Sequence, residues 1–155
     1  MINIRRIIEK DLITSITLDI MNSLPKWFSP PDDIVRKSVS HRDMPFFAAF
    51  DDTKVIGFIA LKVHNEYTAD MYNLGVLEEY HRQGVCHAIL MAVESYCKEN
   101  GYKFITVKTL DSSSQYEPYK RTRAFYFKNG FYSLEMFPLL WDKENPCLFL
   151  AKYIG

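Results

Sequence analysis

The residues best suited to binding a charged ligand form the turn His81-Arg82-Gln83-Gly84. This turn joins a predicted strand to a helical pattern of apolar residues three or four apart. Amide groups at a helix N-terminus lack helical partners and the helix dipole is positive there, so such a turn can bind phosphate. Gly84 would let the backbone approach a ligand closely, and Arg82 adds a positive charge. A simple helix cap explains the same pattern, so the turn alone leaves both interpretations open.

Other phosphate and metal chemistries find little support in the sequence. The chain contains neither G-x-x-x-x-G-K-[ST] nor G-x-G-x-x-G, the usual motifs for nucleoside triphosphates and dinucleotides. Its cysteines, Cys86, Cys97 and Cys147, form no C-x-x-C pair, which argues against a zinc site and against a disulfide framework. We therefore expect no metal.

The elements that must position this turn are predicted by hydrophobic periodicity and by helix and turn signals. The predicted strands span residues 2–8, 46–50, 55–63, 67–77, 103–110, 131–140 and 147–153. The predicted helices span residues 9–24, 32–40, 85 to the stop at Asn100-Gly101, and 118–128, with Asp32 as the N-cap of the second helix.

The order of these elements predicts a mixed α/β sheet. Residues 46–50 and 55–63 are separated by a short polar turn, which favours an antiparallel hairpin that continues into residues 67–77 as a meander. The succession of strand 67–77, a helix and strand 103–110 predicts a right-handed crossover between parallel neighbours. The sheet should therefore contain both antiparallel and parallel pairs.

Length and composition favour one globular domain over residues 1–155, with 48% hydrophobic and 25% charged residues. Nineteen basic residues balance nineteen acidic ones, so net charge does not direct the protein to nucleic acid or to an anionic membrane. No apolar stretch approaches the roughly 20 residues that span a bilayer, and no basic segment leads into an apolar run at the N-terminus. We expect a cytoplasmic protein with no nucleic-acid or membrane partner.

The turn and its helix resemble the signature of the GNAT-type N-acetyltransferase superfamily, V-x-P-x-Y-[QR]-x-x-G-x-[GA]. Val76, Tyr80 and Gly84 match this signature. The departures are Glu78 for Pro, His81 for Gln or Arg, and Cys86 for Gly or Ala. In that superfamily the amides of the turn hold the pyrophosphate of coenzyme A, and these contacts are mainly from the backbone.

A second resemblance lies at residues 125–131, which are similar to the F-Y-x-K-x-G-F element near the end of these enzymes. In addition, residues 140–147 resemble the corresponding segment in a bacterial sub-group of the superfamily. The resemblance covers nearly the whole chain. It implies the GNAT fold, a central mixed and mostly antiparallel sheet of about seven strands with about four helices. In that fold the strands equivalent to residues 67–77 and 103–110 splay apart, and the pantetheine arm inserts between them like an added strand.

The resemblance also implies which residues bind acetyl-CoA, the expected co-substrate. Candidates for coenzyme contacts are Leu74, Val76, His81, Arg82, Gln83, Gly84, Val85, Cys86, His87, Thr122, Phe125 and Tyr126. Leu74 and Val76 would contribute backbone groups, although their side chains are equally compatible with an ordinary core. For His81 and His87, a solvated histidine of a turn explains the sequence as well as a coenzyme contact does.

Direct acyl transfer needs a neutral amine, a polarised thioester carbonyl and a proton for the departing thiolate. If the second motif places Tyr126 at the sulfur, its hydroxyl can donate that proton; otherwise the ring only packs against the coenzyme. Glu66 and His64 are the candidates for deprotonating the amine, directly or through water, and we select Glu66 as the catalytic base. Water alone, with both side chains in a solvated turn, is the alternative.

Aromatic residues could bind the amine by cation–π contact. The candidates are Trp27, Phe28, Tyr72 and Trp141, with the acids Glu66, Asp111 and Asp142 for charge pairing. Trp27 is the strongest candidate for binding the amine, because in proteins of this fold the corresponding loop lies over the acceptor.

The sequence thus predicts an acetyl-CoA-dependent N-acetyltransferase, which moves an acetyl group to a primary amine by direct transfer in a ternary complex. A small-molecule acceptor is favoured. The alternatives are an enzyme that acts on a protein or peptide, and a non-catalytic module that binds acyl-CoA and regulates a partner. A homodimer is left open.

Overall fold

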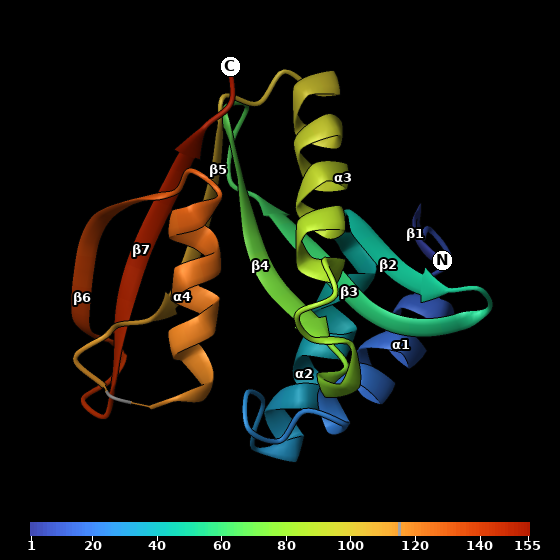
Figure 1. Cartoon of the computed structure of the whole chain (residues 1–155), viewed down its shortest axis with the longest axis horizontal. Helices are drawn as coiled ribbons and strands as arrows, with labels where there is room; N and C mark the ends of the chain where they lie inside the picture. The colour runs from blue at the N-terminus through green and yellow to red at the C-terminus, as the bar shows by residue number, and fades with distance from the viewer. Residues whose placement is uncertain (115) are drawn as a thin grey trace.

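The computed structural model describes residues 1–114 and 116–155, which form a seven-stranded sheet with helices on both faces (Figure 1). The strands are β1 (Ile2–Arg6), β2 (Phe46–Asp51), β3 (Lys54–Val63), β4 (Thr68–Val76), β5 (Phe104–Leu110), β6 (Tyr132–Asp142) and β7 (Asn145–Tyr153). The helices are α1 (Lys10–Asn22), α2 (Pro31–Ser40), α3 (Val85–Glu99) and α4 (Pro118–Lys128), with short 3₁₀ turns η1 (His41–Asp43) and η2 (Glu78–Tyr80).

The strand order is β1-β2-β3-β4-β5-β7-β6, and the β4–β5 pair is parallel whereas the others are antiparallel. α3 connects the parallel pair, as the alternation of strand, helix and strand predicted. The predicted fold class, a mixed and mostly antiparallel sheet of seven strands with four α-helices, is confirmed.

The sheet is divided in the middle, because β4 and β5 pair over a short stretch only. The paired residues are Thr68–Asp70 of β4 and Phe104–Thr106 of β5. Beyond this point the two strands diverge, and Figure 1 shows them close together at the top and apart below. The predicted splay of the middle strands is therefore present, and in the described part of the chain it leaves the rest of β4 without a neighbouring strand on that side.

The two faces of the sheet carry separate cores. α3 packs on one face through Val85, Ile89, Leu90, Val93 and Cys97, together with Tyr126 of α4. α1 packs on the other face through Ile13, Ile16, Ile20 and Met21, together with Ile34 of α2. Leu61 and Ile59 of β3 belong to the α3 side, and Ala60 and Phe58 to the α1 side, as the alternation along a strand requires.

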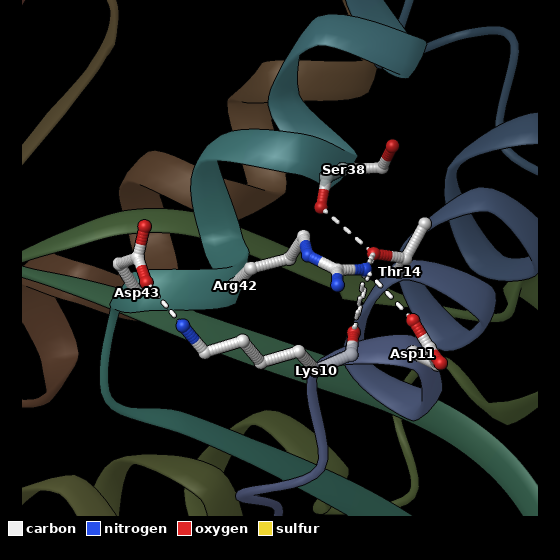
Figure 2. Close-up of polar contacts among 6 residues, drawn as sticks. All are labelled: Lys10, Asp11, Thr14, Ser38, Arg42 and Asp43. Carbon is white, nitrogen blue, oxygen red and sulfur yellow. Dashed lines mark hydrogen bonds and ion pairs between the residues drawn. The ribbon is translucent and has the colours of Figure 1, made fainter.

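Polar contacts fix α1 against α2 and η1 (Figure 2). The guanidinium of Arg42 donates to Asp11 at 3.1 Å and to the Thr14 hydroxyl at 3.0 Å, and Lys10 pairs with Asp43 at 2.8 Å. Such exposed pairs contribute little singly, about 0–1 kcal/mol each. The Thr14 hydroxyl adds a contact to α2 by donating to the Ser38 carbonyl at 3.4 Å, so these bonds connect the start of α1 with the end of α2 and with η1.

The predicted element boundaries agree within a few residues, but the predicted N-cap of α2 is wrong. The N-cap is Pro30, and no side chain of the described ranges caps the helix. Pro31 occupies the first helical position, where its fixed φ is favourable and its missing N–H is not needed. Asp32 lies one residue further, in the first turn, where its charge still complements the helix dipole. None of the helices in the described part of the chain has the length and hydropathy that crossing a bilayer requires.

Candidate functional site

The turn before α3 presents a set of backbone amides without helical acceptors. The first bond of the helix runs from the Ala88 N–H to the Gly84 carbonyl at 3.0 Å, so the N–H groups of the three residues from Val85 to His87 precede the helical ladder. Among the residues that the structure describes, no side chain caps this end. Arg82 and Gly84 have left-handed φ angles of 65° and 81°, and a Cβ on Gly84 would meet no atom of the described residues within 4 Å. The turn thus fits an anion in its backbone conformation, its dipole and its open space.

Several contacts hold this turn in place. Tyr80 donates to Asp51 at the end of β2 at 2.8 Å, and Lys26 pairs with Glu78 at 2.9 Å. The Nε2 of His81 donates to the Val76 carbonyl at 2.7 Å, and its ring meets the Trp27 ring edge-on with centroids 5.3 Å apart. The turn is therefore connected both to the sheet and to the loop between α1 and α2.

The free edge of β4 lies directly beside the turn. The Leu77 N–H donates to the Ile56 carbonyl of β3, and backbone groups alternate in direction along a strand. The N–H and C=O groups of Val76 and Leu74 consequently point toward β5, into the gap. The Val76 carbonyl already accepts the bond from His81, so its N–H and the two groups of Leu74 are the available ones.

Tyr126 projects from α4 into the same region and is only 3% exposed. Its ring contacts Phe125 and Phe131 edge-on, with centroid distances of 5.6 and 5.3 Å. Burial raises the pKa of its hydroxyl well above the usual value, and the nearby groups of Cys86 and Asp70 add to the increase. The phenol therefore stays protonated at neutral pH and is a proton donor.

Asp70 is a functional candidate that sequence reasoning missed. It stands at the last paired position before the strands diverge, opposite Thr106, whose hydroxyl donates to its carboxylate at 2.6 Å. The side chain is 3% exposed, and this burial raises its pKa, although the Thr106 bond and the charges of Lys108, His64 and Lys62 oppose the increase. A buried carboxylate at the apex of the gap can accept a proton. The available signal was an acid within the mostly apolar run of β4.

A bulge in β4 helps to set the direction of these side chains. Ala60 pairs with Asn73 and Lys62 with Asp70, so three steps on β4 oppose two on β3. Ala69 and Met71 belong to the core on the α3 side, which directs Asp70 between them to the opposite face.

A buried histidine supports β4 behind the bulge. Nδ2 of Asn73 donates to Nε2 of His41 at 3.1 Å, so Nδ1 carries the ring proton and donates to the Thr17 hydroxyl at 2.9 Å. Burial lowers the pKa of His41 to about 4, with a smaller contribution from Lys37. His41 is consequently a neutral structural group that fixes Asn73. Sequence reasoning did not single out either residue.

The remaining coenzyme candidates lie around the turn and on α4. Cys86 is partly buried and its pKa is raised to about 11 by burial, so it is a small neutral side chain beside Tyr126. Nδ1 of His87 lies 3.2 Å from the Asn129 side chain at the end of α4. Thr122 and Phe125 are partly buried on α4, and Gln83 donates to the Glu79 carbonyl at 2.9 Å.

The predicted base and acceptor residues are more widely spread. Glu66 is exposed in the turn between β3 and β4. Tyr72 lies at the β4 bulge, and its ring is 6.1 Å from that of His41. Phe28 packs against the core beneath α1, whereas Trp141 is 48% exposed on the edge strand β6, which β5 and β7 separate from β4. Trp141 is thus apart from the other aromatic candidates.

The loop between α1 and α2, residues 23–30, bridges to the start of α4. Trp27 Nε1 donates to the Pro118 carbonyl at 3.1 Å, and the Tyr119 hydroxyl returns a bond to the Trp27 carbonyl at 2.9 Å. A third bond joins the Tyr116 hydroxyl to the Lys26 carbonyl at 2.7 Å. Figure 1 shows this loop below the diverging strands, so it spans the wide end of the gap.

Residues 12–131 match the family model described as the Acetyltransferase (GNAT) family, and the chain belongs to this family. No curated protein sequence matches the chain.

Solved structures agree with this assignment at the level of the fold. A GNAT-family protein from Desulfovibrio desulfuricans has a TM-score of 0.84 at 18% identity, with 100% of both chains covered. The ribosomal-protein-S18-alanine N-acetyltransferase from Escherichia coli has a TM-score of 0.79 at 17% identity, covering 100% of this chain and 95% of that one. An aminoglycoside 6'-N-acetyltransferase complexed with coenzyme A has a TM-score of 0.80 at 16% identity, covering 99% and 97%.

Proposed function

We propose that the protein is an acetyl-CoA-dependent N-acetyltransferase that moves an acetyl group directly to a primary amine in a ternary complex. One observation carries the proposal: β4 and β5 diverge after Asp70 and Thr106, and the diverging end of β4 leads into the amide-rich turn before α3. This arrangement offers a strand edge for an extended ligand and a positive helix end for its phosphates. Membership of the GNAT family and the coenzyme A bound by a structural neighbour support the same ligand.

The residues that would hold the coenzyme follow from the directions of the backbone groups. The amides of Val85, Cys86 and His87 would bind the pyrophosphate, with Arg82 supplying positive charge. The free backbone groups of Leu74 and the N–H of Val76 would pair with the pantetheine arm. His81 donates to the Val76 carbonyl on the gap side, so we expect it to fix this edge of β4.

The chemistry needs a proton acceptor for the amine nitrogen and a proton donor for the leaving sulfur. When bound, acetyl-CoA supplies the activated acyl thioester. The amine nitrogen forms the new bond to the carbonyl carbon as the carbon–sulfur bond breaks. Asp70 accepts the proton of the amine, directly or through water, and Tyr126 donates its proton to the leaving sulfur. Glu66 remains a competing candidate for the base, but its exposed position gives it less influence on a buried reaction.

The bridge between the α1–α2 loop and α4 favours a small acceptor. Its hydrogen bonds, from Trp27, Tyr116 and Tyr119, span the wide end of the gap and restrict access there. Because a structural neighbour acetylates a ribosomal protein, the fold itself does not exclude a protein acceptor. We also propose a reducing, cytoplasmic setting, since Cys86, Cys97 and Cys147 are free thiols.

An acceptor screen tests this function. Purified protein would first be titrated with acetyl-CoA by calorimetry, and then assayed for thiol release with small amines and with peptides that have free N-termini. We expect binding of acetyl-CoA and acceptor-dependent thiol release with small amines. Release with peptides alone would favour a protein acetyltransferase, and binding without release for any amine would favour a non-catalytic module.

A further inference from the structure

Three polar side chains form a row across the sheet on the face opposite α3. In the register of the sheet, Lys62 of β3 pairs with Asp70 of β4, and Asp70 pairs with Thr106 of β5. Leu61 and Val107, their neighbours along the strands, belong to the core under α3. Since side chains alternate between faces, Lys62, Thr106 and Lys108 point to the α1 side with Asp70.

The two lysines flank the carboxylate of Asp70 from both sides of the gap. The ammonium of Lys62 lies 5.7 Å from the centroid of the Tyr72 ring, and that of Lys108 lies 5.2 Å from the centroid of the Phe149 ring. Both charges act on the carboxyl of Asp70. Within residues 1–114 and 116–155, neither lysine forms an ion pair with a carboxylate. The ammonium groups are therefore held over aromatic rings but lack an anionic partner of their own.

This charge distribution selects against a purely cationic acceptor. A simple alkylamine or polyamine that approached Asp70 would meet one buried carboxylate and two lysine ammonium groups, with His64 as a further basic group nearby. Like charges in a partly desolvated site repel strongly, so such an acceptor would bind poorly. An acceptor with a negative group of its own would instead complement the lysines.

We propose that the acceptor is an amine that also carries an anionic group, as an amino acid does, and that Lys62 and Lys108 bind that group while Asp70 faces the amine. This inference rests on the proposed N-acetyltransferase function and names its class of substrate. The anionic group can be a carboxylate, a phosphonate or a phosphate, because a lysine ammonium recognises each as a point charge. Tyr72 and Phe149 position the lysines.

A structural role of the lysines makes a different prediction. If Lys62 and Lys108 only keep Asp70 ionised, their removal should shift the acidic limb of the pH–rate profile equally for every acceptor. If they bind the acceptor, their removal should lower the preference for anionic acceptors over neutral ones at a fixed pH. The ratio of kcat/KM between matched acceptors therefore separates the two roles.

The test uses matched acceptors that differ in one charge. The panel contains glycine, β-alanine, 4-aminobutyrate and the common L-amino acids, each beside its carboxamide, together with 2-aminoethylphosphonate and O-phosphoethanolamine. Values of kcat/KM from thiol release are corrected for the fraction of neutral amine. We expect at least one anionic acceptor to exceed its neutral partner by about tenfold or more.

Substitutions then assign the preference to the lysines. Lys62→Gln and Lys108→Gln should each reduce the ratio of anionic to neutral acceptor by about three- to tenfold, and the double variant should bring it near one. Lys98→Gln is the matched control, because Lys98 is exposed on α3 over the opposite face and its loss should leave the ratio unchanged. Calorimetry with acetyl-CoA shows that each variant is folded.

Three outcomes would overturn the inference. Carboxamides that react as fast as the acids, or a preference that persists in the double variant, would contradict it and leave the acetyltransferase proposal intact. Binding of acetyl-CoA without thiol release for any amine or peptide would instead reject the acetyltransferase function, and the inference with it.

Discussion

At the scale of single residues, two buried groups near the point where β4 and β5 diverge have their neutral forms favoured. Burial raises the pKa of both Tyr126 and Asp70. For the phenol this keeps the proton available for a leaving thiolate, and for the carboxylate it brings the pKa closer to the operating pH of a base. The same environment thus prepares one residue to give a proton and the other to take one.

Replacing Tyr126 with Phe tests the proton donor. The ring and its packing against Phe125 and Phe131 remain, and only the hydroxyl is lost. We expect kcat to fall by about a hundredfold or more, while the affinity for coenzyme A stays nearly constant. Tyr132→Phe, at an exposed position of β6, is the control. Undiminished turnover at saturating substrates, with chemistry limiting the rate, would show that Tyr126 only packs against the coenzyme.

Replacing Asp70 with Asn tests the base. Loss of the carboxylate should lower kcat by about a hundredfold or more and remove the acidic limb of the pH–rate profile. The groups that also titrate or carry charge around this site are Lys62, His64, Lys108 and Tyr126. Glu66→Gln is the competing variant: a larger loss there than in Asp70→Asn would assign the base to Glu66.

Asp70→Asn should raise the stability of the protein although it lowers kcat. The folded-state pKa of Asp70 lies above its ordinary value, so the folded protein holds this proton more tightly than the unfolded chain. As pH rises from about 4 through the folded-state pKa, the free energy of unfolding therefore falls. Asp70→Asn removes this loss, and its amide oxygen can still accept from Thr106. Chemical denaturation should show the variant more stable than the parent at pH 7, with a smaller difference near pH 4; a variant less stable at neutral pH would contradict this.

At the scale of elements, the turn and α3 act together, because Gly84 adopts the backbone conformation that the turn requires and is also the N-cap of α3. Gly84 has a φ of 81°, which other residues adopt at a cost of about 1–2 kcal/mol. Its Cβ direction is open in the described residues, so crowding would come from the ligand and not from the protein.

Gly84→Asp should weaken coenzyme binding at least about tenfold, equal to about 1.4 kcal/mol, because a carboxylate would face the phosphates. Gly101 provides a matched control at the other end of α3, with a φ of 77° and equally open surroundings. Gly101→Asp should lose similar stability but bind the coenzyme normally. Calorimetry would measure both, and unchanged affinity in folded Gly84→Asp protein would refute the phosphate-binding assignment.

Periodicity and glycine stops are local signals, and they were sufficient to predict the elements. The division of the sheet was expected from the family resemblance that the two motifs carry. The sequence was insufficient for Asp70, since the bulge between Asp70 and Asn73 is a property of strand pairing and not of either strand alone. The N-cap of α2 was misplaced for a related reason: Asp32 is a good cap by type, but Pro31 already begins the helix.

At the scale of the whole molecule, the two halves of the sheet are joined by short pairing at one end and by side chains at the other. Thr68–Asp70 and Phe104–Thr106 provide the backbone connection. The α1–α2 loop provides the second connection through its bonds to the start of α4. The width of the gap between β4 and β5, and hence the position of Tyr126 relative to Asp70, depends on both.

Removing the hydroxyls of Tyr116 and Tyr119 together tests this second connection. Each bond is worth about 1 kcal/mol, so Tyr116→Phe/Tyr119→Phe should lower the Tm by several degrees, about 2–4 °C per kcal/mol. We expect faster amide hydrogen exchange at residues 23–30 and at the start of α4, and a higher KM for the acceptor, because a looser gap positions it less well. Tyr67→Phe, at an exposed tyrosine, is the control. Unchanged exchange in residues 23–30 would show that Trp27 alone holds the loop, and an unchanged KM would show that the loop does not shape the acceptor site.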